Sequence, residues 1–186
     1  AVVMTLSGHP ILGLFAAIFA GAAAGFLTAF LQTKMKIQPI LAGIITMTAL
    51  YSINLMVMDD KANVPITQQE SIYTAFGSLV GKQAQGMVLS LLILILAGAA
   101  MVLFLKTPFG LSVRATGDNE SMVRSSSINA DLTKTAGLMG ANACVALSGA
   151  MIAHYNCYAE VRMGIGMVVI GLASFIIGEI AVGIFV

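Results

Sequence analysis

The stretch PFGLSVRATGDNESMVRSSSINADLTK, residues 108–134, is the longest polar interval in a sequence that otherwise consists mostly of hydrophobic segments. Long apolar runs precede and follow it, while Arg114, Arg124 and Lys134 lie within it. We therefore interpret it as a segment exposed at one surface of a membrane-embedded protein.

The composition supports a membrane environment. Hydrophobic residues make up 59% of the 186 residues, charged residues make up 9%, and the mean hydropathy is +0.97. Soluble domains usually contain about 25% charged residues. Cys144 and Cys157 lack the spacing of a metal site, and we expect two unpaired thiols. The composition thus predicts an all-α, polytopic membrane protein.

Five segments are long and apolar enough to cross a bilayer, which requires about 20 helical residues. They are residues 11–32, 39–58, 83–105, 135–153 and 163–186. Residues 68–80 are too short and polar to cross, and predict a short interfacial helix. The chain begins without Met and stops within an apolar run. We therefore expect residues 1–186 to form a single transmembrane domain that is an excerpt of a longer protein.

The first and last spans are distinguished by their small residues. Small residues recur every fourth position in the first, at Gly13, Ala17, Gly21 and Gly25, and predict close contact with a neighbouring helix. The last span contains five glycines and predicts a helix that is bent or broken. These glycines are Gly164, Gly166, Gly171, Gly178 and Gly183.

Polar side chains within the spans have two interpretations. A polar group that faces lipid is unfavourable, so these residues are expected either to pack against other helices or to line a translocation path. Both interpretations stay open for Thr46, Thr48, Asn54, Asn142 and Ser148.

The distribution of Lys and Arg predicts the orientation, because cytoplasmic loops carry an excess of them. Residues 33–38 and 106–134 fall on one side and together hold six, whereas the opposite side holds three. The six are Lys34, Lys36, Lys106, Arg114, Arg124 and Lys134, and the three are Lys61, Lys82 and Arg162. The polar interval is therefore expected to be cytoplasmic.

Within the interval we expect a turn at Gly117 and a short helix over residues 119–127, with Asp118 as its N-cap. This helix would expose Met122 and Val123, with Arg124 beside them. Asn129 is expected to end it in the left-handed conformation, and Asp131 to cap the next span. Such a helix is either a plain connector or a docking element for a soluble partner.

The run GLSVRATGDNESMVRSSSIN, followed by ALSGA and then AEVRMGIGMVVIGLASFIIGE, resembles the permease subunits of bacterial ABC importers of the branched-chain amino acid and ribose type. The earlier run LQTKMKIQPILAGIITMTALYSINL is similar to the basic turn and following helix of that family. The branch that this chain resembles contains amino-acid permeases, including ones assigned to tryptophan or tyrosine. The matching positions in the polar interval are Gly110, Arg114, Ala115, Gly117, Asn119, Ile128 and Asn129.

The resemblance implies a permease subunit of an ATP-binding-cassette importer in the bacterial inner membrane, forming half of the path for a small solute, an amino acid rather than a sugar. Residues 117–129 would form the coupling helix that fits a cleft in the ATPase. The ATPase-coupling residues so implied are Arg114, Gly117, Asp118, Asn119, Glu120, Met122, Val123 and Arg124.

The partners implied are a cytoplasmic ABC ATPase, a second permease subunit in a homo- or heterodimer, a periplasmic or lipid-anchored substrate-binding protein, and membrane lipid, with no nucleic acid. The sequence contains no phosphate-binding loop of the G-x-x-x-x-G-K-[ST] kind. ATP hydrolysis is therefore expected on another subunit, and we expect neither enzymatic activity nor a cofactor in this chain.

Two positions depart from the family pattern. Ser127 stands where the family usually has glycine before Ile-Asn, and Glu179 follows Gly178 where a pair of glycines is frequent. The first departure predicts a docking helix that binds less tightly or ends earlier. The second places a charge where close backbone approach would be expected.

Glu179, Ser148 and His154 bear on two other classes of function. A secondary transporter or channel subunit driven by an ion gradient would use an intramembrane carboxylate, and Glu179 is the candidate, although its position also fits an interfacial residue. An intramembrane protease would need Ser148 and His154 to meet. Six helical residues turn a side chain by about 240° net, so this pairing is disfavoured.

Overall fold

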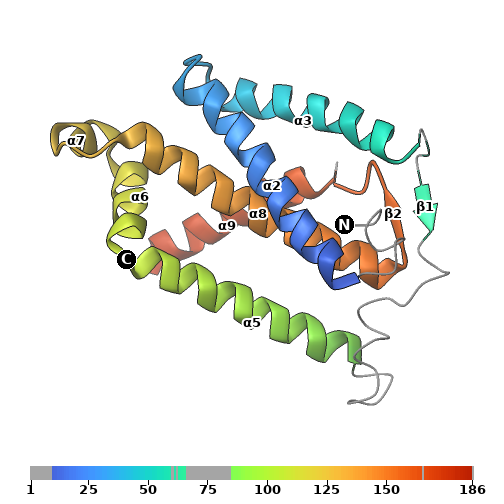
Figure 1. Cartoon of the computed structure of the whole chain (residues 1–186). Coiled ribbons are helices and arrows are strands. Elements are labelled where there is room, and N and C mark those ends of the chain that lie inside the picture. The colour runs from blue at the N-terminus through green and yellow to red at the C-terminus, as the bar shows by residue number, and fades with distance from the viewer. Residues whose placement is uncertain (1–9, 60, 62, 66–84, 165, 186) are drawn as a thin grey trace.

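The computed structural model describes residues 10–59, 61, 63–65, 85–164 and 166–185. It is a bundle of long helices with one small ribbon of two strands (Figure 1). The elements in chain order are α2 (Pro10–Thr33), α3 (Pro39–Val57), β1 (Asn63–Pro65), α5 (Gln85–Lys106), α6 (Pro108–Asp118), α7 (Glu120–Ser125), α8 (Ala130–Asn156), β2 (Tyr158–Glu160) and α9 (Met167–Phe185). The expected all-α class is confirmed.

The main packing interface joins α2 to α8, which cross in the middle of the bundle (Figure 1). A methyl group on Gly21 would lie 2.5 Å from the carbonyl oxygen of Asn142, and one on Gly25 would lie 2.5 Å from that of Leu138. Because only glycine permits this approach, the prediction of close packing along this stripe is confirmed. This close backbone contact at Gly21 and Gly25 fixes the position of α2 along α8.

Helix α3 follows α2 after a short turn and diverges from it (Figure 1). Pro39 occupies the first turn of α3, where its missing N–H needs no partner. The Thr28 hydroxyl donates a hydrogen bond of 3.0 Å to Thr46 Oγ1, and both side chains are buried. This polar pair joins α2 to α3, while the far end of α3 diverges from α8 (Figure 1).

Two short strands pair at the end of the bundle where α3 diverges from α8. Strands β1 and β2 are antiparallel, with Asn63 opposite Glu160 and Pro65 opposite Tyr158. The ribbon links the segment after α3 to the end of α8, where Cys157 adopts the left-handed conformation with φ 57°. The ribbon and α7 therefore lie at opposite ends of α8 (Figure 1).

Four helices within the described residues are long and apolar enough to cross a membrane, namely residues 11–33, 39–57, 87–106 and 130–156. They correspond to the first four expected spans, but the fourth begins five residues earlier than predicted. The fifth, α9, was expected to be broken, yet it is one continuous helix through Gly171 and Gly178. Gly171 and Gly178 are exposed and an added methyl group would meet nothing within 4 Å at either, so no backbone interruption is needed.

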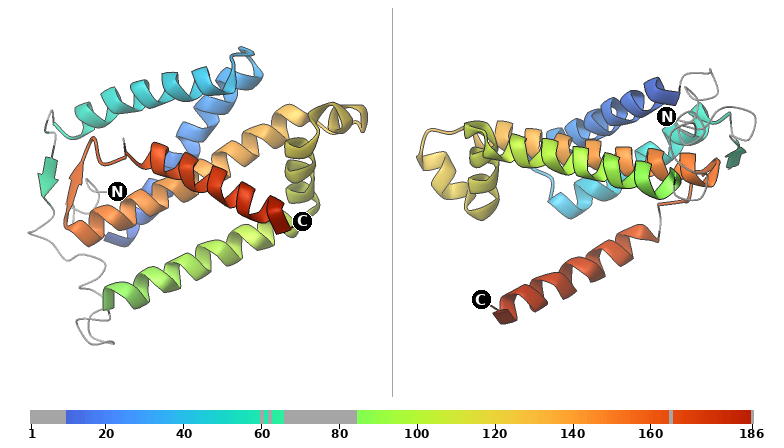
Figure 2. Two further views of the ribbon diagram at one scale, coloured as in Figure 1. Left: turned by 180° about the vertical axis from the view of Figure 1, so that it is seen from behind. Right: turned by 90° about the horizontal axis from the view of Figure 1, so that it is seen from below.

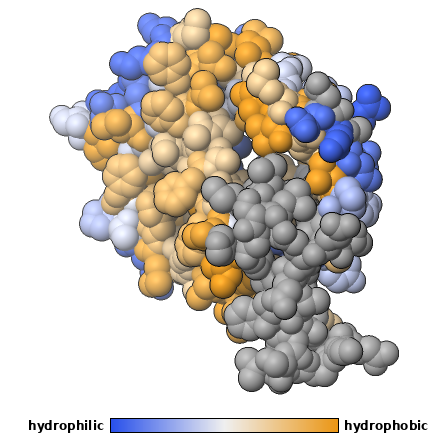
Figure 3. All heavy atoms as spheres, turned by 45° about the vertical axis from the view of Figure 1, so that its right-hand side comes forward, coloured by the Kyte–Doolittle hydropathy of each residue, from blue (hydrophilic) through white to orange (hydrophobic). Residues whose placement is uncertain are grey.

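Helix α9 lies apart from the other helices, as the view from below in Figure 2 shows. The expected interfacial helix over residues 68–80 lies outside the described residues. Large apolar side chains such as Phe19, Ile40 and Leu96 are exposed on the outside of the bundle. Apolar residues cover much of the face in Figure 3, with hydrophilic residues toward its margins. Such a surface suits lipid or further helices.

Candidate functional site

The corner between α5 and α6 positions the polar interval. The Thr107 hydroxyl accepts a hydrogen bond of 3.1 Å from the Gly110 N–H and donates one of 2.6 Å to the Phe104 carbonyl. A methyl group on Gly110 would lie 2.6 Å from Leu105 Cα, so glycine is required at this corner. The Phe104 and Phe109 rings meet edge to face with centroids 6.3 Å apart. The end of α5 thus holds α6 at a fixed angle.

Helix α6 differs from the sequence prediction because it includes the residues expected to form a turn. Gly117 lies inside α6, and Asp118 is its last residue rather than the N-cap of the next helix. The Oγ1 atoms of Thr116 and Thr133 lie 2.8 Å apart, with the two side chains buried. This hydroxyl pair fastens α6 to α8.

Asn119, rather than Asp118, caps α7. Its side-chain oxygen accepts hydrogen bonds from the Met122 N–H at 3.1 Å and from the Ser121 hydroxyl at 2.7 Å. Asn119 has an extended backbone with φ −152°, which suits an N-cap. The expected short helix therefore exists, but it covers Glu120–Ser125 and is shorter than predicted.

The left-handed residue after α7 is Ser127, with φ 60°, and not Asn129 as predicted. Asn129 instead caps α8, because its side-chain oxygen accepts hydrogen bonds from the Asp131 and Leu132 N–H groups at 3.1 and 3.2 Å. Asp131, predicted as that cap, lies in the first turn of α8. Ser127 thus occupies the position where the resembling family usually has glycine.

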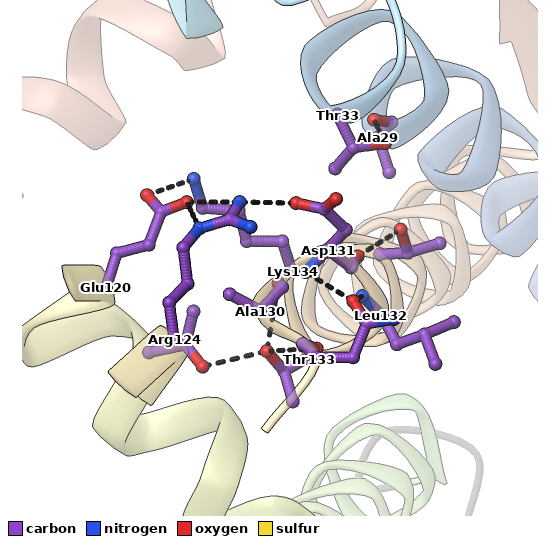
Figure 4. A network of polar contacts seen from close by, with 12 residues as sticks. Ala29, Thr33, Glu120, Arg124, Ala130, Asp131, Leu132, Thr133 and Lys134 are labelled. Carbon is purple, nitrogen blue, oxygen red and sulfur yellow. Dashed lines mark hydrogen bonds and ion pairs between the residues drawn. The ribbon is translucent and has the colours of Figure 1, made fainter. Parts of the chain in front are cut away.

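Four charged side chains link α7 to the start of α8 (Figure 4). Arg124 contacts Glu120 Oε1 at 2.9 Å and Asp131 Oδ1 at 2.6 Å, while Lys134 Nζ lies 2.5 Å from Glu120 Oε2. These four residues form what we call the charged clasp. Its members are partly exposed, so each pair alone contributes little to stability, but together they restrict how α7 sits on α8.

The clasp changes the proton affinities of two of its members. Hydrogen bonding from Lys134, and then from Arg124, holds the pKa of Glu120 below its usual value. Hydrogen bonding to Glu120, and then to Asp131, raises the pKa of Arg124 above its usual value. Both shifts favour the charged forms of Glu120 and Arg124 that the clasp requires.

The two apolar residues predicted to dock have different environments. Met122 is 66% exposed, whereas Val123 is 4% exposed and packs inward. Arg114, Gly117 and Asp118 are exposed on α6. We call this set of exposed residues, Arg114, Gly117 and Asp118 of α6 with Met122 of α7, the α6–α7 face.

The predicted path residues are not all brought together. Asn54 and Ser148 both line a cavity of about 920 Å³ among α2, α3, α8 and β2. Ser148 also borders a cavity of about 700 Å³ between α5 and α8. The other three lie elsewhere: Thr46 in its pair with Thr28, Thr48 hydrogen-bonded to its own helix through the Ile44 and Ile45 carbonyls, and Asn142 hydrogen-bonded to the Leu138 carbonyl.

Sequence reasoning missed three features of these sites. The pairing of Glu120 with Arg124 was readable from the i,i+4 spacing, but the contacts of Asp131 and Lys134 depend on the turn at Ser127. The Thr116–Thr133 pair had no sequence signal. Glu160 was not among the predicted path residues, yet it lines the larger cavity.

Taken together, the spans and the two ends of α8 define a multi-pass helical membrane protein with a stiffened polar element at one end and a cavity at the other. Residues 1–186 match the family described as the permease component of branched-chain amino acid transport systems, and the chain belongs to this family. It is accordingly a multi-pass membrane protein, located in bacteria in the inner membrane.

Two relatives are informative. The chain is 38% identical over 169 residues to the tyrosine transport system permease protein of Clostridioides difficile (strain R20291), covering 91% of this chain and 55% of that one. It is 29% identical over 163 residues to an uncharacterized protein of Rickettsia prowazekii (strain Madrid E), covering 88% and 56%. No solved structure matches the chain. The chain spans about half the length of the curated relatives that it matches.

Proposed function

We propose that the chain is part of the permease subunit of an ATP-binding-cassette importer for an amino acid, and that the α6–α7 face docks on a cytoplasmic ATPase. The relative from Clostridioides difficile, whose name assigns it to tyrosine transport, favours an aromatic or other apolar amino acid. A second permease subunit would complete the path, and a periplasmic or lipid-anchored binding protein would deliver the solute. ATP hydrolysis belongs to the partner.

The observation that carries the docking role is that both α6 and α7 are fastened to α8. Thr116–Thr133 fastens α6 to α8, and the charged clasp fastens α7 to α8. A plain connector between two spans needs neither, whereas a docking element must transmit force without deforming. The exposed Met122 supplies an apolar group for a groove on the partner.

The orientation is tested by labelling. Ser121 is exposed on α7, and Ser121→Cys is expected to resist a membrane-impermeant maleimide added to intact cells and to react after the membrane is opened. The background would carry Cys144→Ser and Cys157→Ser to remove the native thiols. Labelling in intact cells would place α7 outside and remove the docking proposal.

Uptake measurements test whether ATP or an ion gradient drives transport. Full-length permease reconstituted with its ATPase and binding protein is expected to take up a labelled amino acid only when ATP is supplied inside. Collapse of the ion gradient by ionophores should leave that uptake in place. Uptake that follows the ion gradient and ignores ATP would instead establish the secondary transporter.

A further inference from the structure

The cavity at the end of α8 opposite α7 has a distinctive lining. Its volume of about 920 Å³ lies at the upper end of the range typical of small-molecule sites. Among the described residues that line it, the polar side chains are those of Asn54 on α3, Ser148 on α8 and Glu160 on β2. The remaining lining residues are alanine, valine, methionine, isoleucine and glycine.

Glu160 gives this cavity its charge. It is the ionisable member of the described lining, and Arg162, two residues further on, does not line it. The salt bridges of the described residues all lie in the charged clasp, at the other end of α8. The pairing of Glu160 with Asn63 fixes its backbone in the ribbon. Glu160 is exposed and lines the cavity, so a short strand rather than a loose loop holds it at the cavity's edge.

The three polar groups complement the two charges of an amino acid. A carboxylate binds an ammonium group strongly, while the Asn54 amide N–H and the Ser148 hydroxyl can donate to a substrate carboxylate. The alanine, valine and methionine wall suits an apolar side chain. We propose that Glu160 is a specificity-determining residue, which selects solutes carrying an α-ammonium group at this cavity. The inference rests on the proposed transport of an amino acid.

The test measures the charge preference of the cavity directly. Ser148→Cys, in the full-length assembled transporter with Cys144→Ser and Cys157→Ser, would be treated with a cationic or an anionic methanethiosulfonate. Each rate would be divided by the rate of that reagent with free 2-mercaptoethanol. We expect the cationic reagent to be favoured about tenfold, because the carboxylate attracts it. Glu160→Gln should lower that ratio at least about threefold.

A matched control is available at the same end of the molecule. Asp59 directly follows the cavity residue Met58, but it does not line the cavity, and its φ of 59° suits asparagine. Asp59→Asn should therefore leave the ratio unchanged. An unchanged ratio in Glu160→Gln, or an equal fall in Asp59→Asn, would overturn the assignment to Glu160.

Substrate protection completes the test. An equimolar mixture of L-amino acids with uncharged side chains should slow modification of Ser148→Cys, whereas the same mixture after N-acetylation should not. Glu160→Gln should abolish the protection. Equal protection by the acetylated mixture, or none by either, would overturn the proposal. These measurements need no ATP, so their failure is distinct from failure of ATP-driven uptake.

Discussion

Arg124 on α7 donates a hydrogen bond of 2.6 Å to the carboxylate of Asp131 on α8, across the turn at Ser127. Because the same guanidinium also holds Glu120, the residue predicted as a contact for a partner is occupied within the chain. Its role in the docking proposal is therefore to position α7.

Reversing this charge should disconnect α7 from α8. Arg124→Glu places a third acid beside Glu120 and Asp131, and we expect substrate-stimulated ATP hydrolysis to be abolished while the protein still inserts. Hydrolysis would be measured in proteoliposomes. The exchange Arg124→Asp with Asp131→Arg restores an opposite pair and should recover much of the stimulation. Failure of the exchange to recover any would indicate that Arg124 itself contacts the partner.

Met122 and Val123 should respond differently, because one is exposed and the other is buried. Met122→Asp is expected to weaken co-purification of the ATPase at least about tenfold without changing thermal stability in detergent. Val123→Ala should lower stability by about 1 kcal/mol or more with a smaller effect on binding. The reverse pattern would show that Val123 forms the docking surface.

Alanine and proline at position 117 should have opposite effects on α6. Nothing lies within 4 Å of a methyl group added there, so Gly117→Ala should be tolerated and should stabilise α6 by about 0.5 to 1 kcal/mol. Gly117→Pro should disrupt the last turn of α6 at a cost of about 3 kcal/mol and abolish stimulated ATP hydrolysis. Stimulated hydrolysis at the original level in the proline variant would contradict the need for a rigid α6.

Substitution of Gly25, at the contact between α2 and α8, should lower the stability of the protein. Gly25→Ala would place its methyl group 2.5 Å from the Leu138 carbonyl oxygen, so the helices must separate. We expect a loss of about 1 to 3 kcal/mol, visible as a lower temperature of aggregation in detergent. Gly43→Ala, which meets nothing within 4 Å, serves as the control and should not lower that temperature. Equal effects would mean that α2 and α8 are not in backbone contact.

Ser127 offers a test of the turn between α7 and α8. At φ 60°, glycine is unstrained and a β-branched residue is strongly disfavoured. Ser127→Gly should preserve stimulated ATP hydrolysis, whereas Ser127→Val should reduce it as the clasp loses its geometry. The two variants would be compared for hydrolysis and for the yield of intact complex. Equal activity of both would show that the turn does not set the position of α7.

Much of the fold follows from local chemistry. Length and hydropathy located the first four spans, and the spacing of Gly21 and Gly25 indicated the face of α2 that packs closely. Glycine content wrongly predicted a broken α9, because a glycine in an exposed helix leaves the backbone hydrogen bonds intact. Propensity also placed the N-cap at Asp118, one residue too early, since α6 continues through Gly117.

The sites were less accessible to prediction. The contacts of Lys134 with Glu120, and of Thr116 with Thr133, join residues 14 and 17 positions apart, and they depend on the angle between helices. The cavity shared by Asn54, Ser148 and Glu160 likewise depends on the divergence of α3 from α8. Such distances arise from tertiary packing and leave no periodic signal in the sequence.

Helix α8 runs without interruption from the clasp to the cavity, and its residues Asp131 and Ser148 are about 26 Å apart along the axis. A helix of this length behaves as a stiff rod, so a tilt imposed at one membrane surface reappears as a displacement at the other. Whatever pushes on Asp131 therefore also moves the wall beside Ser148, and no separate relay between the two surfaces is needed.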